Sequence, residues 1–259
     1  MEPVRSHRNS RVVDAARLHR ARVRKETGRS LLEGPNLLAE ALAAGITPLQ
    51  VFALADDRDT ASLAAGNDFD LLIVDSRAMD RLAGTSTPRG PVAEFEIPES
   101  TTLNGSGLVV SWGVSDPGNV GTMIRTASAF GWDFGYATGS ADAWSPKVLR
   151  AAAGGHFHVA MMHVKSPGQL TGLGYTTVAT VVEGGVSPGT LRLARPAVLV
   201  GEEAHGLPAG IAAHCDEQVT VPMPGGAESL NAAVAAGIVV YAIANSLAHP
   251  EPGSNLPPT

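Results

Sequence analysis

The sequence predicts an α/β protein built in two parts, and two observations carry this prediction. Short apolar or β-branched runs alternate with segments of helical periodicity along almost the whole chain. A polar stretch at residues 98–107 interrupts the alternation once. The chain has 259 residues, 44% of them hydrophobic, which is enough for two ordinary domains with buried cores. We therefore expect a first domain over residues 1–100, a second over residues 107–249, and a loose tail over residues 250–259.

The expected first domain is a compact layer of alternating strands and helices. Pro35 and Gly45 bracket one of the helices, because proline is tolerated in the first helical turn and glycine commonly ends a helix. The predicted strands are residues 30–33, 49–54, 71–74 and 92–97. The predicted helices are residues 11–25, 36–44, 60–65 and 77–82, and in the first of these Arg17, Arg20, Arg22 and Arg24 are expected to point outward.

The alternation resumes at residue 108 and indicates a mostly parallel sheet covered by helices on both faces. In such sheets, ligands bind at the carboxyl ends of the strands. Asn119 is well placed to cap the first helix of this part. The predicted strands are residues 108–112, 134–137, 158–164, 176–182, 197–200 and 219–221. The predicted helices are residues 120–130, 145–153, 208–214 and 232–244, with a helical turn at residues 167–173.

The second part is organised around residues 219–231. Two prolines and two adjacent glycines end a short strand there, and Ser229 or Asn231 can cap the helix that follows. That helix is apolar on every side, which predicts a fully buried position, and it is too short to span a membrane. A stiff loop that carries polar groups to the edge of a core predicts a ligand site.

The formal net charge of −6 is distributed unevenly. Residues 1–29 hold nine Arg or Lys against three acids, whereas the remainder holds ten against 22. A basic arm on an acidic body is compatible with a polyanionic partner, and equally with a solvated helix face. The chain shows neither a signal peptide nor a transmembrane run, so we expect a cytoplasmic protein without membrane association.

The spacing of residues argues against several kinds of site. The chain has no G-x-G-x-x-G, no G-x-x-x-x-G-K-[ST] and no G-x-S-x-G, which disfavours an ordinary doubly wound metabolic enzyme. His156 and His158 alternate onto one face of a predicted strand, but no third ligand follows at suitable spacing, so no metal is expected. The single cysteine, Cys215, excludes an internal disulfide and fits a small buried side chain.

Three motifs follow three predicted strands. They are N-x-G-x-x-x-R-T-A at residues 119–127, G-E-E-A-H-G-L at residues 201–207 and V-P-M-P-G-G-A-E-S-L-N at residues 221–231. Together with W-S-P-K-V-L-R-A-A-A-G at residues 144–154, they resemble the SpoU, or TrmH-like, RNA 2′-O-ribose methyltransferases of the SPOUT superfamily. The region from about residue 11 to residue 97, with S-L-L-E-G, resembles the L30e-like RNA substrate-binding domain that precedes the catalytic domain in many members.

The resemblance implies a SPOUT α/β domain with a deep trefoil knot, a homodimer, and S-adenosyl-L-methionine as the donor for methylation of ribosomal or transfer RNA. Arg125 matches the family's proposed catalytic base, whereas Glu202 stands where many members have asparagine. The residues that match the family's catalytic site are Asn119, Arg125, Glu203, Ser229 and Asn231. The residues that match its cofactor-binding positions are Gly201, Val221, Met223 and Leu230.

The residue types suit this chemistry. A ribose 2′-hydroxyl is a poor nucleophile and needs a proton acceptor or strong orientation. The sulfonium charge disappears as the methyl group leaves, so an apolar pocket suits the transition state. Because the pKa of arginine lies above about 12, two roles for Arg125 stay open: a base assisted by a phosphate, or a cation that orients phosphate or alkoxide. The alternative is a non-catalytic RNA- and cofactor-binding factor in ribosome assembly, which the combination of Arg125, Ser229 and Asn231 disfavours.

Overall fold

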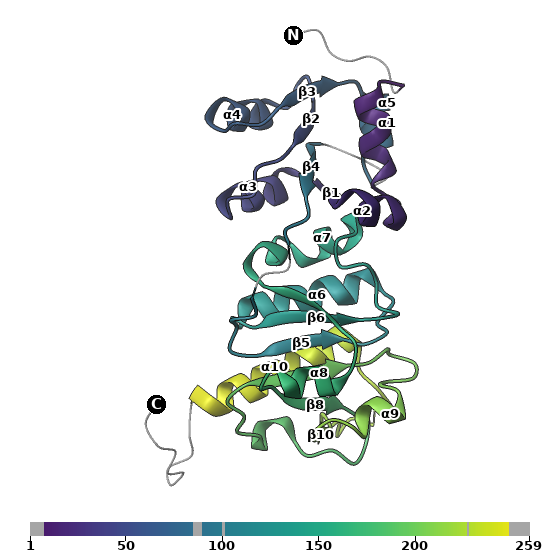
Figure 1. Cartoon of the computed structure of the whole chain (residues 1–259), viewed down its shortest axis with the longest axis vertical. Coiled ribbons are helices and arrows are strands. Elements are labelled where there is room, and N and C mark those ends of the chain that lie inside the picture. Colours follow the sequence, from purple (N-terminus) through teal and green to yellow (C-terminus); the bar gives the residue numbers. More distant parts are fainter. Residues whose placement is uncertain (1–7, 85–89, 100–101, 227, 249–259) are drawn as a thin grey trace. The chain divides into compact units, whose positions relative to one another are not determined.

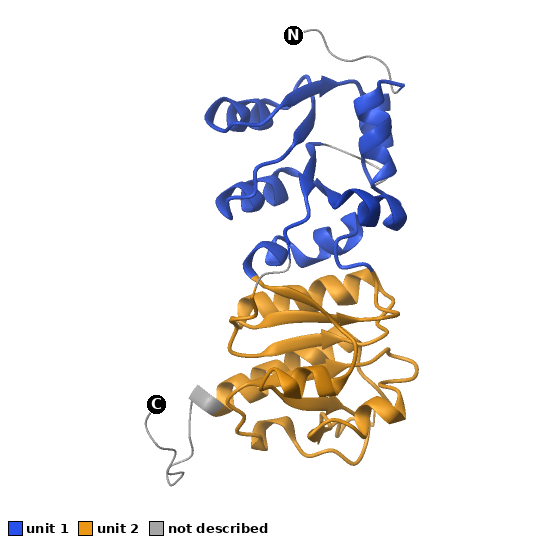
Figure 2. Ribbon diagram, in the orientation of Figure 1, with its two compact units in different colours: residues 1–99, 142–158 blue, residues 100–141, 159–259 orange. Residues whose placement is uncertain are grey.

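The computed structural model forms two compact units (Figure 2). The first unit comprises residues 1–99 and 142–158, and the second comprises residues 100–141 and 159–259. Segment 142–158, which we expected in the second domain, therefore packs with the first unit. The expected tail lies outside the described residues. The structure describes residues 8–84, 90–99, 102–226 and 228–248 (Figure 1).

The first unit contains a four-stranded mixed sheet with the order β1-β4-β2-β3. β4 pairs antiparallel with β1 and β2, and β2 pairs parallel with β3. The strands are β1 (Arg29–Glu33), β2 (Gln50–Leu54), β3 (Leu71–Val74) and β4 (Val92–Glu96). The helices are α1 (Ser10–Arg17), α2 (Ala21–Thr27), α3 (Pro35–Ala43), α4 (Arg58–Gly66), α5 (Ser76–Leu82) and α7 (Pro146–Ala152), followed by the 3-10 turn η1 (Gly155–His158).

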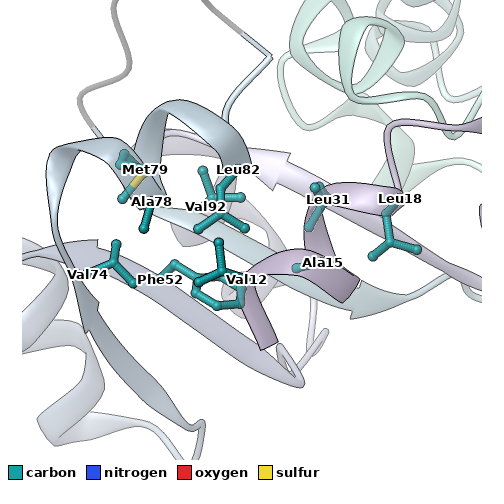
Figure 3. Packing of buried hydrophobic residues seen from close by; sticks show 10 residues of the cluster. All are labelled: Val12, Ala15, Leu18, Leu31, Phe52, Val74, Ala78, Met79, Leu82 and Val92. Atoms are coloured by element: carbon teal, nitrogen blue, oxygen red, sulfur yellow. The ribbon is translucent and has the colours of Figure 1, made fainter. Parts of the chain in front are cut away.

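Two apolar clusters stabilise the first unit. In one, side chains of α1 and α5 pack around Phe52 of the sheet (Figure 3). In the other, Leu149 of α7 packs with Leu32, Leu38 and Phe95. Fully burying a side chain of this size contributes about 1.5–3 kcal/mol. Helix α7 is therefore part of the core of the first unit, although its sequence lies between two strands of the second.

The helix predicted over residues 11–25 is two helices in the structure. α1 ends at Arg17, Leu18 turns into the core, and Arg20 has an extended backbone with φ −89° and ψ 123°. The change of direction turns Arg24 inward, where it is only 4% exposed. Its guanidinium donates to the carbonyl of Leu18 at 2.6 Å and to Asp142 through Nε at 3.0 Å. The prediction that Arg24 points outward was therefore wrong.

The second unit contains a six-stranded sheet with the order β10-β8-β9-β5-β6-β7, and every pairing is parallel. The parallel sheet was predicted, but β7 begins at Met161, so His156 and His158 lie in a 3-10 turn and not on a strand. The strands are β5 (Leu108–Ser111), β6 (Asp133–Ala137), β7 (Met161–Val164), β8 (Thr176–Thr180), β9 (Pro196–Val200) and β10 (Glu217–Val219). The helices are α6 (Pro117–Ala129), α8 (Pro167–Gly172), α9 (Ala209–Ala212) and α10 (Ala232–Ala248), with a 3-10 turn η2 (Pro188–Thr190).

Helices cover both faces of this sheet. α6 and α10 pack against each other, and α8 and α9 cover the cluster that includes Leu108 and Leu199. The prediction that α10 is buried on every side was wrong, because Val234, Ile238 and Tyr241 are 51%, 39% and 59% exposed. These three side chains have helical spacing and form one uncovered apolar face. Among the described helices, none is long and apolar enough to cross a membrane.

Candidate functional site

A cavity of about 430 Å³ lies at the carboxyl ends of β8, β9 and β10 in the second unit. These strands are neighbours in the parallel sheet, so the segments that follow them meet at one edge. Thr180, Val200 and Val219 end the three strands and line the cavity. A cavity of this size suits a small organic ligand such as a nucleoside derivative.

Gly201 shapes the loop that follows β9. It is buried, and a Cβ atom at this position would lie 2.1 Å from the carbonyl carbon of Gly206 and 2.3 Å from the nitrogen of Leu207. The loop folds back because the N–H of Gly206 donates to the carbonyl of Glu202 at 2.7 Å. The absence of a side chain at Gly201 lets the backbone of its own loop approach closely. This fold places Glu202 and Glu203 on the lining of the cavity.

The loop after β10 supplies the opposite part of the lining. Val221, Met223, Ser229 and Leu230 all border the cavity, as does Gly201. The four residues predicted to bind a cofactor therefore lie around one cavity. Ser229 does not cap α10; Asn231 does, because its Oδ1 accepts from the N–H groups of Ala233 at 3.0 Å and Val234 at 3.2 Å.

The first motif opens helix α6. The helix begins at Pro117, and Asp116 is its cap, since Oδ1 of Asp116 accepts from the N–H of Asn119 at 2.8 Å. The prediction that Asn119 caps the helix was wrong, because the Asp-Pro pair supplies both the cap and the favoured first residue. The amide of Asn119 is therefore available for contacts with other loops.

That amide joins the three motifs. Nδ2 of Asn231 donates to Oδ1 of Asn119 at 2.8 Å, and Nδ2 of Asn119 donates to Oε1 of Glu203. The amide oxygen of Asn119 therefore accepts one hydrogen bond and its amide nitrogen donates one, and the final acceptor of this network is the carboxylate of Glu203. Three segments that lie far apart in the sequence are held together at the edge of the sheet.

Arg125 stands apart from this network. It lies on α6 six residues after Asn119, or about 9 Å further along the helix axis. Its side chain is exposed, is not part of the cavity lining, and has no hydrogen-bond or ion-pair partner in the described part of the chain. The structure therefore brings together Asn119, Glu203 and Asn231 but leaves the guanidinium free to meet a molecule from outside.

Part of the cavity lining was not predicted from the sequence. Thr180 ends β8, Val181 and Val182 follow it, and all three border the cavity, as do His205 and Glu228. The residues after β8 carry no motif, and only the position of β8 between β9 and β10 would have identified them. Sheet order is a long-range property that local periodicity does not encode.

The histidines and the cysteine have structural surroundings. Nε2 of His156 lies 2.7 Å from the carbonyl of Ala143, and burial lowers the pKa of this histidine to about 4. Cys215 is half-buried; its Sγ lies 3.4 Å from the carbonyl of Ile211, and burial raises the pKa of the thiol to about 11. Over the residues that the structure describes, no group of three or more His, Cys, Asp or Glu side chains could hold a metal ion.

Known proteins resemble this chain over nearly its whole length. The SpoU rRNA Methylase family model matches residues 107–241, and the MRM3-like substrate binding domain matches residues 9–93. The chain is 33% identical over 246 residues to the 23S rRNA (guanosine(2553)-2′-O)-methyltransferase RlmP of Bacillus subtilis (strain 168). The aligned region covers 93% of this chain and 98% of the relative.

Two solved structures share the fold. An AdoMet-bound rRNA methyltransferase from Sinorhizobium meliloti has a TM-score of 0.82 and 26% identity, with 95% of this chain and 98% of that chain covered. An RNA 2′-O ribose methyltransferase has a TM-score of 0.81 and 27% identity, with 95% and 99% covered. The similarity in both cases extends over the two units.

Proposed function

The chain belongs to the SpoU rRNA methylase family, and on that premise we propose that it transfers a methyl group from S-adenosyl-L-methionine to a ribose 2′-hydroxyl of structured RNA. Ribosomal RNA is the favoured substrate, because the family name and the relative from Bacillus subtilis both refer to it. The observation that carries the proposal is the cavity at the strand ends, which gathers all four residues selected for cofactor binding.

The lining of this cavity fits the methyl donor. Apolar side chains such as Val181, Val200 and Leu230 suit an adenosine group, and loop backbone at the strand ends offers hydrogen-bonding groups. Glu202 and Glu203 bring negative charge to a cavity that would receive a sulfonium cation. When bound, this donor supplies an electrophilic methyl group; Gly201, Val221, Met223 and Leu230 are the residues that we propose hold it.

The polar network is proposed to organise the reacting side of the site. Asn231 and Asn119 hold the loop of Glu203 against the start of α6. With the loops fixed, a ribose can meet the donor in a reactive geometry, which is a large part of what catalysis requires. Ser229 lines the cavity and is exposed, so we propose that its hydroxyl contacts the RNA or the donor.

Arg125 is proposed to act on the RNA and not on the methyl donor. Its exposed, unpartnered guanidinium suits a phosphate or a ribose oxygen, which arginine binds through its fork of donors. Both roles described above remain, a base assisted by phosphate or a cation that orients phosphate or alkoxide. The cationic role needs no deprotonation of arginine and is the one we favour.

We further propose a homodimer formed through the apolar face of α10. Val234, Ile238 and Tyr241 are exposed on this helix, and Phe130 at the end of α6 is 37% exposed and packs edge-on against Tyr241 with ring centroids 6.3 Å apart. A monomer rarely leaves a contiguous patch of large apolar side chains in water. A second copy of the chain would cover this patch through the same face.

The first unit is proposed to bind the RNA substrate, in keeping with its match to a substrate-binding domain. Its basic segment is not a free arm, because α1 and α2 are packed helices and several of their arginines form ion pairs within the unit. These pairs are Arg11–Asp70, Arg17–Asp14, Arg22–Glu26 and Arg24–Asp142. Exposed Arg20 and Lys25 have no such partner among the described residues and are the better candidates for phosphate contacts.

Two further expectations belong to the same proposal. The trefoil knot implied by the resemblance is proposed for the C-terminal part of the second unit, where the loops after β9 and β10 meet. A cytoplasmic location is proposed because ribosomal RNA is methylated where ribosomes are assembled. Cell fractionation tests the second point, since recovery in the membrane fraction would contradict it.

A methyl-transfer assay distinguishes the enzyme from a non-catalytic assembly factor. Purified protein is incubated with unmodified ribosomal RNA, and separately with transfer RNA, in the presence of the radiolabelled donor. We expect label in ribosomal RNA. Binding of RNA and donor without transfer of label to either RNA would favour the non-catalytic alternative.

A further inference from the structure

The cavity at the carboxyl ends of β8, β9 and β10, which we call the donor cavity, has several acidic side chains in its lining. Glu202, Glu203 and Glu228 line it, and among the described lining residues there is no lysine or arginine. His205 also lines the cavity, and its side chain is 82% exposed with Nδ1 3.4 Å from Oε2 of Glu202. The carboxylates therefore dominate the charge of the lining.

The three carboxylates are not equivalent. Glu203 accepts from Asn119 and belongs to the network that joins the motifs. Glu228 is exposed in the loop before α10. Glu202 directly follows buried Gly201, its carbonyl is fixed by the N–H of Gly206 at 2.7 Å, and its side chain is only 42% exposed. The hydrogen bond fixes the backbone from which this side chain extends on the cavity lining, and the side chain is partly shielded from solvent.

A partly shielded carboxylate on the cavity lining interacts differently with the two forms of the cofactor. The methyl donor carries a sulfonium cation, whereas the product left after methyl transfer, S-adenosylhomocysteine, carries a neutral thioether. The two molecules otherwise share the same adenosine and amino-acid groups. Charge is therefore the main property by which the cavity can distinguish donor from product, and coulombic attraction acts on the donor alone.

We propose that Glu202 is a specificity-determining residue that makes the cavity prefer the cationic donor over the neutral product; this inference rests on the proposed function. The attraction favours loading of the donor and release of the product. It does not favour the chemical step itself, because the positive charge is lost as the methyl group leaves and the interaction weakens toward the transition state. Glu202 thus acts on occupancy of the site.

The test measures binding of donor and product separately by isothermal titration calorimetry in one buffer at constant pH. We expect the wild-type protein to bind the donor about tenfold more tightly than the product, a ratio equivalent to ~1.4 kcal/mol. Glu202→Gln should reduce this preference to about threefold or less by weakening donor binding, with the product affinity changed less than about twofold.

Two controls make the test specific. Glu183→Gln removes a carboxylate that is exposed on the same unit but does not line the cavity, and it should leave the preference unchanged. Raising the salt concentration from about 0.05 to about 0.5 M should lower the preference of the wild-type protein, since partly exposed charges are screened. An unchanged ratio in Glu202→Gln, or an equal fall in both affinities, would overturn the inference but leave the proposed function standing. Failure of the wild-type protein to bind either molecule would overturn both.

Discussion

Nδ2 of Asn231, at the start of α10, donates a 2.8 Å hydrogen bond to Oδ1 of Asn119, in the first turn of α6. The two residues are 112 positions apart in the chain. Asn231 also caps α10 through its other amide atom, so one side chain both begins a helix and joins two motifs. These two roles can be separated by mutation.

Replacing Asn231 with serine should keep the cap and break the bridge. Serine is a good helix cap, but its hydroxyl is too short to reach Asn119 as the amide does. We expect Asn231→Ser to leave the free energy of unfolding nearly unchanged while lowering methyl transfer. Asn231→Ala should lower both, with a loss of about 1 kcal/mol from the missing cap. Urea denaturation and initial rates measure the two effects, and full activity of the serine variant would show that the bridge is dispensable.

Arg125→Ala should slow methyl transfer without weakening donor binding. The side chain is exposed and does not line the cavity, so we expect a fall of about 10²–10³ in kcat from the loss of one cationic donor, and an unchanged Kd for the donor. A rise in this Kd would contradict the proposed position of the guanidinium on the RNA side.

Arg125→Lys distinguishes the two roles of the arginine in part. A lysine loses its proton far more readily than an arginine. If the pH dependence of turnover is retained in this variant, a specific role of arginine as the base is excluded and the cationic role stands. A rate–pH profile that shifts by several pH units would instead support proton abstraction at this position.

Gly201→Ala should disrupt the donor cavity. The added methyl group would lie 2.1 Å from the carbonyl carbon of Gly206, and backbone at that distance must move. We expect the loop after β9 to open and donor affinity to fall by about tenfold or more, equivalent to ~1.4 kcal/mol. Gly210→Ala is the matched control, because a Cβ atom there meets nothing within 4 Å. Equal donor affinities in the two variants would show that the loop is not held as described.

Acid should destabilise the first unit through His156. The pKa of this buried histidine is lowered to about 4 from an ordinary value of 6.5, so the unfolded chain binds the proton first as the pH falls. The free energy of unfolding should therefore decline between pH 6.5 and pH 4 by about 3 kcal/mol in total, and this loss is absent above pH 6.5.

His156→Gln provides the comparison for this pH dependence. Glutamine can donate to the carbonyl of Ala143 as the histidine ring does, but it does not titrate. The variant should show a flatter stability profile between pH 6.5 and 4 when both proteins are denatured with urea. Parallel profiles for the two proteins would contradict the assignment of this proton uptake to His156.

Ile238→Glu should separate the proposed dimer. A carboxylate in the middle of the exposed face of α10 would be buried without a partner at the interface, which is strongly unfavourable. Light scattering should report a dimer for the wild-type protein and a monomer for the variant. Leu173→Glu, at an exposed leucine outside this face, should remain a dimer. A wild-type monomer, or a dimeric Ile238→Glu, would contradict the interface.

Local patterns in the sequence predict most elements of this fold. The parallel sheet, the ligand loop before α10 and the cap at Asn231 follow from strand periodicity and from proline, glycine and asparagine chemistry. The division of residues 10–27 into two helices does not, because no glycine or proline marks it. It arises from the burial of Leu18 and Arg24, which depends on contacts with distant segments such as the one that contains Asp142.

Part of the candidate site likewise depends on long-range packing that local sequence patterns do not predict. The motifs identify residues that line the cavity because they carry unusual turn chemistry, but Thr180, at the end of β8, and Val182, two residues later, carry no such signal. They reach the cavity only because β8 lies between β9 and β10. The exposed face of α10 was also missed, since an apolar helix surface looks the same in sequence whether its own chain or a second copy covers it.

The position of the methyl group on the RNA distinguishes ribose 2′-O-methylation from methylation of a base. RNA methylated by the purified protein with radiolabelled donor is hydrolysed in alkali, which cleaves only next to a free 2′-hydroxyl. We expect the label to appear in alkali-resistant dinucleotides, because a methylated 2′-oxygen cannot attack the adjacent phosphate. Label confined to mononucleotides would place the methyl group elsewhere and contradict the account.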